Sequence, residues 1–179
     1  NNSAQGVSAL RFNKTGSFNS AQGTYALYSN TTGSSNSAQG FYALYSNTTG
    51  SNNSAQGRDA GRYLADGVTA NQTSNNSVFL GSNTKSKQAG QTNEIVIGAN
   101  AIGNGSNTAT IGHTDVTDTY LRGKGHFTGS VQIGDDTAVA SFENKGATRY
   151  RENAGGSFYE MVMKQTDGSY AWQSIVFNQ

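Results

Sequence analysis

The sequence predicts an all-β fold in which short coils stack into a parallel β-roll, or β-solenoid. Three observations support this prediction. A 17-residue unit repeats over residues 1–69, and its four copies open at Asn2, Asn19, Asn36 and Asn53. The chain is rich in Gly, Asn, Ser and Thr, and its apolar positions lack a helical period. Charged residues make up only 13% of the chain and aromatic residues 10%, which favours an ordered chain over a disordered one.

Each copy contains two short segments that we expect to be extended, followed by a turn-rich run. In the second copy these are Ser20–Gly23, Tyr25–Tyr28 and Ser29–Ser35. A unit this short cannot bury its apolar face alone, so neighbouring copies must stack. Stacked strands lie about 4.8 Å apart and align identical residues in ladders. We expect one ladder of leucines and, on the opposite face, one of alanines, formed by Leu10, Leu27 and Leu44 and by Ala9, Ala26 and Ala43.

Glycines recur at fixed offsets in the repeat, as at Gly23 and Gly40. Because glycine adopts positive φ without a Cβ penalty, these positions predict coil corners. The fourth copy departs from the pattern, with Gly61 where the other copies have leucine. We interpret the next segment, Ala70–Asn75, as a short insertion that breaks the 17-residue register of the repeat.

Three further strand-plus-glycine units follow, at Asn76–Gly81, Asn93–Gly98 and Asn107–Gly112. Apolar residues occupy both faces of these strands, and we expect Ile97 and Ile111 to be ladder positions as well. A single coil has only one interior, so the second apolar face needs a partner. Seven coils at about 4.8 Å each make a rod of roughly 34 Å, whose interior is thin. We therefore expect a homotrimer.

The repeat resembles known fibre proteins. The stretch Asn93–Gly112 resembles the head repeat of trimeric autotransporter adhesins, a left-handed parallel β-roll assembled as a trimer. The Asn-Ser-Ala-x-Gly unit with its Ala-Leu-Tyr-Ser-Asn-Thr-Thr-Gly-Ser run is similar to a longer variant in phage tail fibres and bacterial fibre proteins. The resemblance covers residues 1–112 and implies a trimeric β-roll shaft. This sequence differs by having glutamine where isoleucine is frequent, at Gln5, Gln22, Gln39 and Gln56.

Two further regions follow the shaft of residues 1–112. Residues 113–137 lack the repeat and resemble the neck segments of phage tail fibres. Residues 138–179 hold most of the large side chains, and three segments there read as strands: Thr148–Arg151, Ser157–Lys164 and Ser169–Phe177. The Asp167-Gly168 pair between two of them is typical of a hairpin turn. We expect a small antiparallel β domain that serves as a C-terminal tip or trimerisation domain.

The sequence offers little catalytic chemistry, and we expect no enzyme, no cofactor and no bound metal. His113 and His126 lack a metal-ligand spacing, although one histidine on a trimer axis would provide three ligands. Asp135-Asp136 has no third acidic neighbour for Ca²⁺. Glycoside hydrolysis needs two carboxylates at a set separation in a groove. The chain has enough carboxylates, at Glu94, Glu143, Glu152 and Glu160, but the sequence gives no sign that two of them form such a pair.

The candidate ligand-binding residues are aromatic. The net charge of +1 and the scattered basic residues argue against a nucleic-acid partner, and no apolar run is long enough to insert in a membrane. Ring faces and adaptable polar groups suit a glycan. We select Trp172 and Tyr170, beside the Asp167-Gly168 turn, together with Tyr159 and Arg151.

These observations predict an extracellular attachment protein. We expect the distal receptor-binding part of a homotrimeric phage tail fibre, or of a related injection-system fibre, located on the virion. Its partners would be two identical chains and a host surface glycan or outer-membrane protein. Two alternatives stay open: the head of a bacterial trimeric adhesin at the cell surface, and a purely structural fibre segment.

Overall fold

The computed structural model describes residues 1–116, 148–153, 156–164 and 170–174. The regular elements in these ranges are all β-strands, so the all-β prediction is confirmed for the described part of the chain. A search of the same residues finds no helix suited to crossing a membrane. The chain divides into two units, which are described separately.

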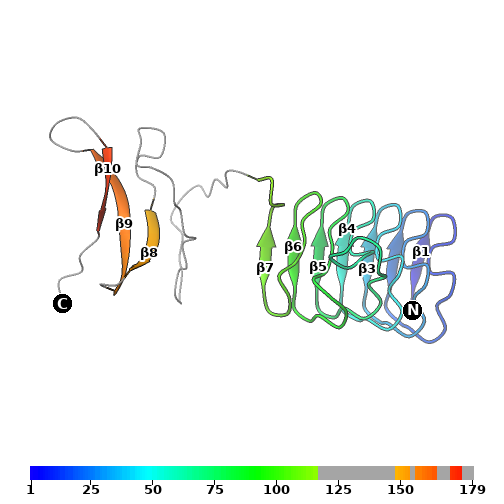
Figure 1. The fold of residues 1–179 in the computed structure, drawn as a ribbon. Helices are drawn as coiled ribbons and strands as arrows, with labels where there is room; N and C mark the ends of the chain where they lie inside the picture. Colours follow the sequence, from blue (N-terminus) through cyan, green and yellow to red (C-terminus); the bar gives the residue numbers. More distant parts are fainter. Residues whose placement is uncertain (117–147, 154–155, 165–169, 175–179) are drawn as a thin grey trace. The chain divides into compact units, whose positions relative to one another are not determined.

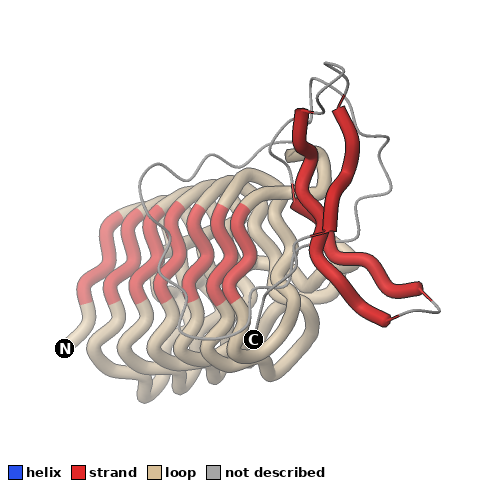
Figure 2. Tube along the Cα trace, turned by 90° about the vertical axis from the view of Figure 1, so that its left-hand side faces the viewer, coloured by secondary structure: helices blue, strands red, loops and turns tan. Residues whose placement is uncertain are grey.

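The first unit is a parallel β-solenoid, as the repeat predicted. Seven strands of three residues each lie side by side in chain order and point the same way (Figure 1). They align on one face of the stacked coils, and turns form the remainder of each coil (Figure 2). The strands are β1 (Ser3–Gln5), β2 (Ser20–Gln22), β3 (Ser37–Gln39), β4 (Ser54–Gln56), β5 (Val78–Leu80), β6 (Ile95–Ile97) and β7 (Ala109–Ile111).

The central residue of each strand from β2 to β6 points into the coil. Ala21 pairs with Ala38, and both are almost fully buried, whereas the residues on either side of them are exposed. Larger side chains take this position in later coils, where Phe79 of β5 and Val96 of β6 are 0% exposed. The core is therefore one narrow column of apolar side chains along the shaft.

The leucine and alanine ladders exist, but the prediction that they lie on opposite faces is wrong. Ala26 and Leu27 are both 0% exposed. The segment Tyr25–Tyr28 forms a turn instead of a strand, with Tyr25 at φ 60° and Leu27 at φ 51°. Left-handed residues break the alternation of an extended chain, which lets consecutive side chains enter the coil. Left-handed backbone costs about 1–2 kcal/mol per residue, and burying a leucine contributes about 1.5–3 kcal/mol.

Buried asparagines satisfy the backbone at the coil turns. Asn30 Nδ2 donates to Gly33 O at 2.8 Å and to Asn13 Oδ1 at 2.7 Å, and Asn47 repeats both bonds one coil later. A second ladder runs beside the strands, where Asn36 N donates to Asn19 Oδ1 at 3.0 Å. Each asparagine thus bonds within its own coil and to the next one, which holds identical residues in register.

Close approach of neighbouring coils explains the repeated glycines. Gly23 has φ +132°, as expected at a corner, and an added Cβ would lie 2.6 Å from Gly40 O. Gly33 does not have a positive φ, but a Cβ added there would lie 2.2 Å from Gly50 O. Glycine is required at the second position because the backbones nearly touch there, which differs from the conformational reason that the sequence suggested.

The insertion in the fourth coil lies earlier than predicted. Ser54 pairs with Val78. The neighbouring hydrogen bond, from Ser77 N to Asn53 Oδ1, joins residues 24 positions apart, whereas the equivalent bond of the preceding coil joins residues 17 apart. The extra residues form a small hairpin closed by the antiparallel bridge between Tyr63 and Ala70. The segment Ala70–Asn75 instead resumes the coil, because Thr48 N donates to Gln72 O at 3.0 Å.

The second unit contains a three-stranded sheet of order β10-β9-β8. Both neighbouring pairs are antiparallel. The strands are β8 (Thr148–Asn153), β9 (Gly156–Lys164) and β10 (Tyr170–Ser174). The predicted Asp167-Gly168 turn, His126, Asp135-Asp136 and most of the predicted neck lie outside the described residues.

Candidate functional site

Four tyrosines on the outside of the shaft form two stacked columns. Tyr25 and Tyr42 stack with centroids 5.2 Å apart and ring planes 9° from parallel. Tyr28 and Tyr45 stack at 5.0 Å and 2°. Within a coil the rings meet edge to face, at 5.3 Å for the Tyr25–Tyr28 pair and 5.0 Å for the Tyr42–Tyr45 pair. All four rings are half-buried.

The repeat itself creates this arrangement. Identical residues of neighbouring coils lie at about the strand spacing of 4.7–4.9 Å, which is close to the stacking distance of aromatic rings. Tyr25 and Tyr42 both have φ 60°, and the same turn therefore aims both rings outward. An aromatic pair stabilises by about 0.5–1.5 kcal/mol beyond the burial of its area, so the columns favour coil register as well.

Arginines cap both ends of the columns. At one end Phe12 meets Tyr28 edge to face at 4.8 Å, and the Arg11 guanidinium lies 5.6 Å from the centre of the Phe12 ring. At the other end the Arg62 guanidinium lies 4.2 Å from the centre of Tyr42 and 4.7 Å from that of Tyr45. We call this surface the tyrosine ledge; it comprises Arg11, Phe12, Tyr25, Tyr28, Phe41, Tyr42, Tyr45, Arg58 and Arg62.

The ledge is positively charged. Among the described residues its neighbouring carboxylate is Asp59, which accepts a hydrogen bond from Arg62 Nη1 at 2.7 Å and lies 3.6 Å from Arg58 Nε. The Arg58 side chain is 68% exposed. The first 58 residues of the chain contain no Asp or Glu, and their cations are Arg11, Lys14 and Arg58. An anionic ligand would therefore meet little repulsion along this part of the shaft.

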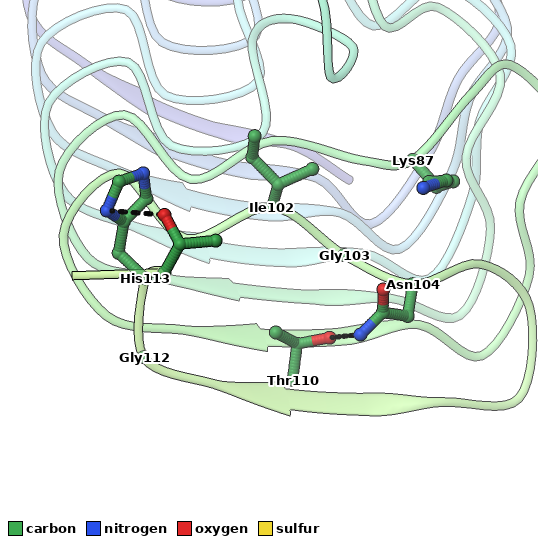
Figure 3. Close-up of a pocket in the computed structure, with 8 residues that line it drawn as sticks. Lys87, Ile102, Gly103, Asn104, Thr110, Gly112 and His113 are labelled. Atoms are coloured by element: carbon green, nitrogen blue, oxygen red, sulfur yellow. Dashed lines mark hydrogen bonds between the residues drawn. The ribbon is translucent and has the colours of Figure 1, made fainter. Parts of the chain in front are cut away.

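A cleft of about 400 Å³ lies in the last coils of the shaft. Figure 3 shows Lys87 and His113 at opposite ends of it, with Asn104 donating to Thr110 Oγ1 between them at 3.4 Å. His113 Nδ1 is 3.2 Å from Asp115 Oδ2, and Asp115 is exposed. Asp115 is not among the lining residues, and the two titratable groups that do line the cleft, Lys87 and His113, lie at opposite ends of it. Its lining also includes Ile102, Gly103, Gly112 and Thr114.

Glu94 is buried, and its carboxylate accepts hydrogen bonds that hold neighbouring turns together. Its carboxylate accepts from Ser86 Oγ at 2.7 Å and from the backbone N–H groups of Gly105 at 2.9 Å and Lys87 at 3.2 Å. The side chain is 0% exposed. Among the described residues no group of three or more His, Cys, Asp and Glu side chains is arranged to hold a metal ion.

The outward face of the β1–β7 sheet changes character along the shaft. In the early coils it carries serine and glutamine, and Gln39 Nε2 donates to Gln22 Oε1 at 2.9 Å. The glutamines thus form a ladder outside the roll. In β5–β7 the same positions are apolar, with Leu80 40% exposed and Ile111 62% exposed. Leu80, Ile97 and Ile111 are aligned by the strand register.

The residues predicted to bind a ligand lie in the second unit, where the strand register places three of them at positions of one parity. Trp172 is opposite Val162, Tyr170 is opposite Lys164, and Arg151 is opposite Phe158. Because partners directly opposite share a face, these three belong to one face of the sheet. Tyr159, which is opposite Tyr150, belongs to the other.

The ladder residues lie in two places. Leu10, Leu27 and Leu44 are buried in the coil interior, whereas Ile97 and Ile111 belong to the outer strand face. Arg11, Arg58 and Arg62 were not predicted to be members of a site. Arg62 lies 17 residues after Tyr45, and Arg11 lies 17 before Tyr28. The repeat alignment therefore contained a signal for both capping arginines.

The comparisons with known proteins identify no relative. No protein-family model matches the chain, and no curated protein or solved structure shows significant similarity to it.

Proposed function

We propose that this chain is the distal part of a homotrimeric fibre that attaches a phage tail, or a related injection system, to its host cell. The shaft is residues 1–112, the neck 113–137 and the C-terminal tip 138–179. The protein acts outside the host, on the virion, by binding a surface glycan or outer-membrane protein without catalysis. The likeness of the repeat to fibre and adhesin repeats motivates this proposal.

The outward apolar face of β5–β7 is the observation that supports a fibre of several chains. Two rows of aliphatic side chains run along it, parallel to the shaft; Leu80 is 40% and Ile111 62% exposed, and Val78, Ile95 and Ile97 are half-buried. Contiguous exposed apolar rows of this kind mark association surfaces in soluble proteins. The rows are formed by Val78, Leu80, Ile95, Ile97, Ala109 and Ile111.

A closed ring of three copies would bury this apolar face on every chain. A ring of three identical chains joined head to tail closes on itself and leaves no unpaired interface. With the rows parallel to the shaft, the chains would lie side by side and bury the aliphatic residues around a common axis. The narrow core of each coil then gains the apolar burial that a single coil lacks.

The tip supplies the receptor contact in this proposal. Tyr170, Trp172 and Arg151, which share one face of the sheet by register, are the residues we assign to it, with Tyr159 on the opposite face. Three tips in one fibre, and several fibres on one particle, convert weak single contacts into durable attachment through effective concentration.

Sedimentation velocity of the full chain tests the assembly. We expect a mass three times that of the 18.8 kDa chain. Ile97→Glu should dissociate the trimer, because it places three charges in the apolar interface. Gln22→Glu, on the polar part of the same strand face, is the matched control and should leave the trimer intact. A monomeric native chain would contradict the proposal.

Binding of fluorescently labelled trimer to a panel of bacterial strains tests attachment. We expect binding to a subset of strains, reduced about tenfold or more by Trp172→Ala, because an aromatic anchor contributes about 2 kcal/mol or more when truncated. A trimer that binds no strain favours the purely structural alternative. Antibody labelling of bacterial cells, in place of virions, favours the adhesin alternative.

A further inference from the structure

The tyrosine ledge leaves its hydroxyl groups available. The ring faces of Tyr25, Tyr28, Tyr42 and Tyr45 stack against one another, so the rings present their edges and hydroxyl groups outward. The four hydroxyls have no hydrogen-bond partner in the described part of the chain, and none of them is a buried atom, so they reach solvent. A phenolic hydroxyl both donates and accepts, so the two columns form a regular array of unpaired polar groups.

Exposed aromatic rings flank this array. Phe12 is 48% exposed and contacts Tyr28, and Phe41 is 45% exposed with its centroid 4.1 Å from that of Tyr42. Flat apolar rings beside adaptable hydroxyls match the two kinds of surface of a pyranose, which has C–H faces and an equatorial rim of hydroxyls. The aromatic faces open to solvent are few, which makes base stacking of a nucleic acid the weaker interpretation.

The charges select an acidic ligand. Among the described residues, the carboxylate beside the arginines of the ledge is Asp59, which accepts a hydrogen bond from Arg62 Nη1 and lies 3.6 Å from Arg58 Nε. Arg11 lies at the other end of the columns and pairs with no carboxylate in the described part of the chain, and the Arg58 side chain is 68% exposed despite its contact with Asp59. Guanidinium groups bind carboxylates in a planar two-bond geometry, so each end has the donor that a uronic acid requires. Arg62, held between Asp59 and the tyrosines, orders the columns as a positioning residue.

The array is linear. The columns run along the stacking direction from the first coil, with Arg11, to the fourth, with Arg58 and Arg62, which spans about 15 Å at the strand spacing. A chain of sugars fits this length better than a single sugar. The ledge also lies in the coils whose strand face is polar, whereas the apolar strand face proposed as the trimer interface begins at β5.

We propose that the tyrosine ledge binds an acidic polysaccharide along the shaft, with its carboxylates on Arg11 and Arg58 and its hydroxyls on the four tyrosines. This inference rests on the proposed attachment function and deepens it by giving the ligand class and a second binding surface besides the tip. The ligand chemistry is that of a uronic-acid polymer, as found in bacterial capsules and in other extracellular polysaccharides.

Calorimetric titration of the full chain with polygalacturonate fragments tests the ledge. We expect saturable binding that the carboxyl-reduced polymer does not show. Arg11→Gln with Arg58→Gln should weaken binding about a hundredfold, because each of the two charged hydrogen bonds contributes roughly a factor of ten. Replacing all four tyrosines by phenylalanine keeps the stacking and should weaken binding about fivefold or more. Lys14→Gln removes a cation outside the ledge and should change affinity less than twofold.

Several outcomes would overturn the inference. They are an absence of saturable binding, equal binding of the carboxyl-reduced polymer, or equal losses in Lys14→Gln and in the ledge variants, which would indicate a general polyanion effect. Circular dichroism and sedimentation of each variant establish that it is folded and assembled. The proposed function is judged separately by the bacterial strains: an unmodified chain that binds cells but does not bind the polymer would refute the ledge and retain the attachment function.

Discussion

Phe79 occupies the space that a leucine would need at Gly61. A Cβ added to Gly61 would lie 2.7 Å from Phe79 Cδ2 and 3.0 Å from Leu44 Cδ2. Gly61 stands one repeat after Leu44, and Phe79 follows Ala55 in the strand register. The fourth coil has therefore lost its leucine, and the fifth has replaced a small residue by a large one, so the volume of the core is conserved across the two coils.

This pair predicts strong non-additivity. Phe79→Ala should lower the free energy of unfolding by about 3–5 kcal/mol because it opens a cavity. Gly61→Leu alone should also destabilise, through its clash with the ring, since φ +65° is near the values of 47–53° that three leucines of the shaft adopt. The double variant restores the pattern of the earlier coils and should recover at least about 1 kcal/mol relative to the sum. Chemical denaturation of all four proteins measures the coupling, and additive losses would refute the compensation.

The asparagine ladder predicts a large cost for losing one amide. Asn36 Nδ2 donates to Gly50 O at 2.8 Å, and its Oδ1 accepts from Asn53 N at 3.0 Å. Asn36→Ala leaves the Asn53 N–H buried without a partner and removes one of the two donors to Gly50 O, which keeps Asn47 Nδ2 at 3.0 Å. The change should cost about 1–3 kcal/mol in denaturant unfolding. Gln39→Ala, which removes an exposed ladder amide, is the control and should cost less than about 0.5 kcal/mol. Similar costs for the two variants would show that the ladders do not depend on burial.

Glu94 is predicted to act as an acceptor hub. Glu94→Gln preserves the shape of the side chain but replaces one acceptor oxygen by a donor, which then faces a hydroxyl or a backbone N–H group. We expect a loss of about 1–3 kcal/mol, with faster hydrogen exchange at the amides of Lys87 and Gly105. Exchange at the distant Asn36 amide serves as the internal reference. Unchanged protection at Lys87 and Gly105 would contradict this role.

The hairpin of the fourth coil predicts a local pH dependence. The Thr69 hydroxyl, the Thr69 N–H and the Val68 N–H all bond the Asp66 carboxylate, and together they lower its pKa below the ordinary value of 3.8. A lowered pKa means that the folded hairpin favours the ionised carboxylate. The resulting stabilisation is present above about pH 3.8 and is lost as the pH falls through the lowered pKa.

Carboxyl NMR measures this titration directly. The Asp66 midpoint should lie below 3.8 and should move up toward that value in Thr69→Val, which removes the hydroxyl donor. Asp66→Asn should remove the acid-dependent change in the chemical shifts of Val68 and Thr69. A midpoint at or above 3.8 in the unmodified chain would refute the assignment.

The order of the shaft follows from the sequence alone. Repetition with a constant spacing brings Ser20 opposite Ser37 and Ala21 opposite Ala38, because equal coils stack residue on residue. The same spacing places Tyr45 in line with Arg62, so even the arginine cap of the ledge is implied by the repeat. The buried strand centres and the exposed residues beside them follow from the two-residue period of extended backbone.

Other features of the shaft depend on tertiary contacts that a periodic sequence pattern does not predict. Leu27 enters the core beside Ala26 because left-handed backbone turns it inward, and no two-residue pattern predicts that. The hairpin at Tyr63–Ala70 and the match between Gly61 and Phe79 depend on contacts between coils whose spacing has changed, so they could be located only once the stacked coils were known. Repetition dictates which residues align, whereas the volume shared between neighbouring coils dictates which side chains can fill it.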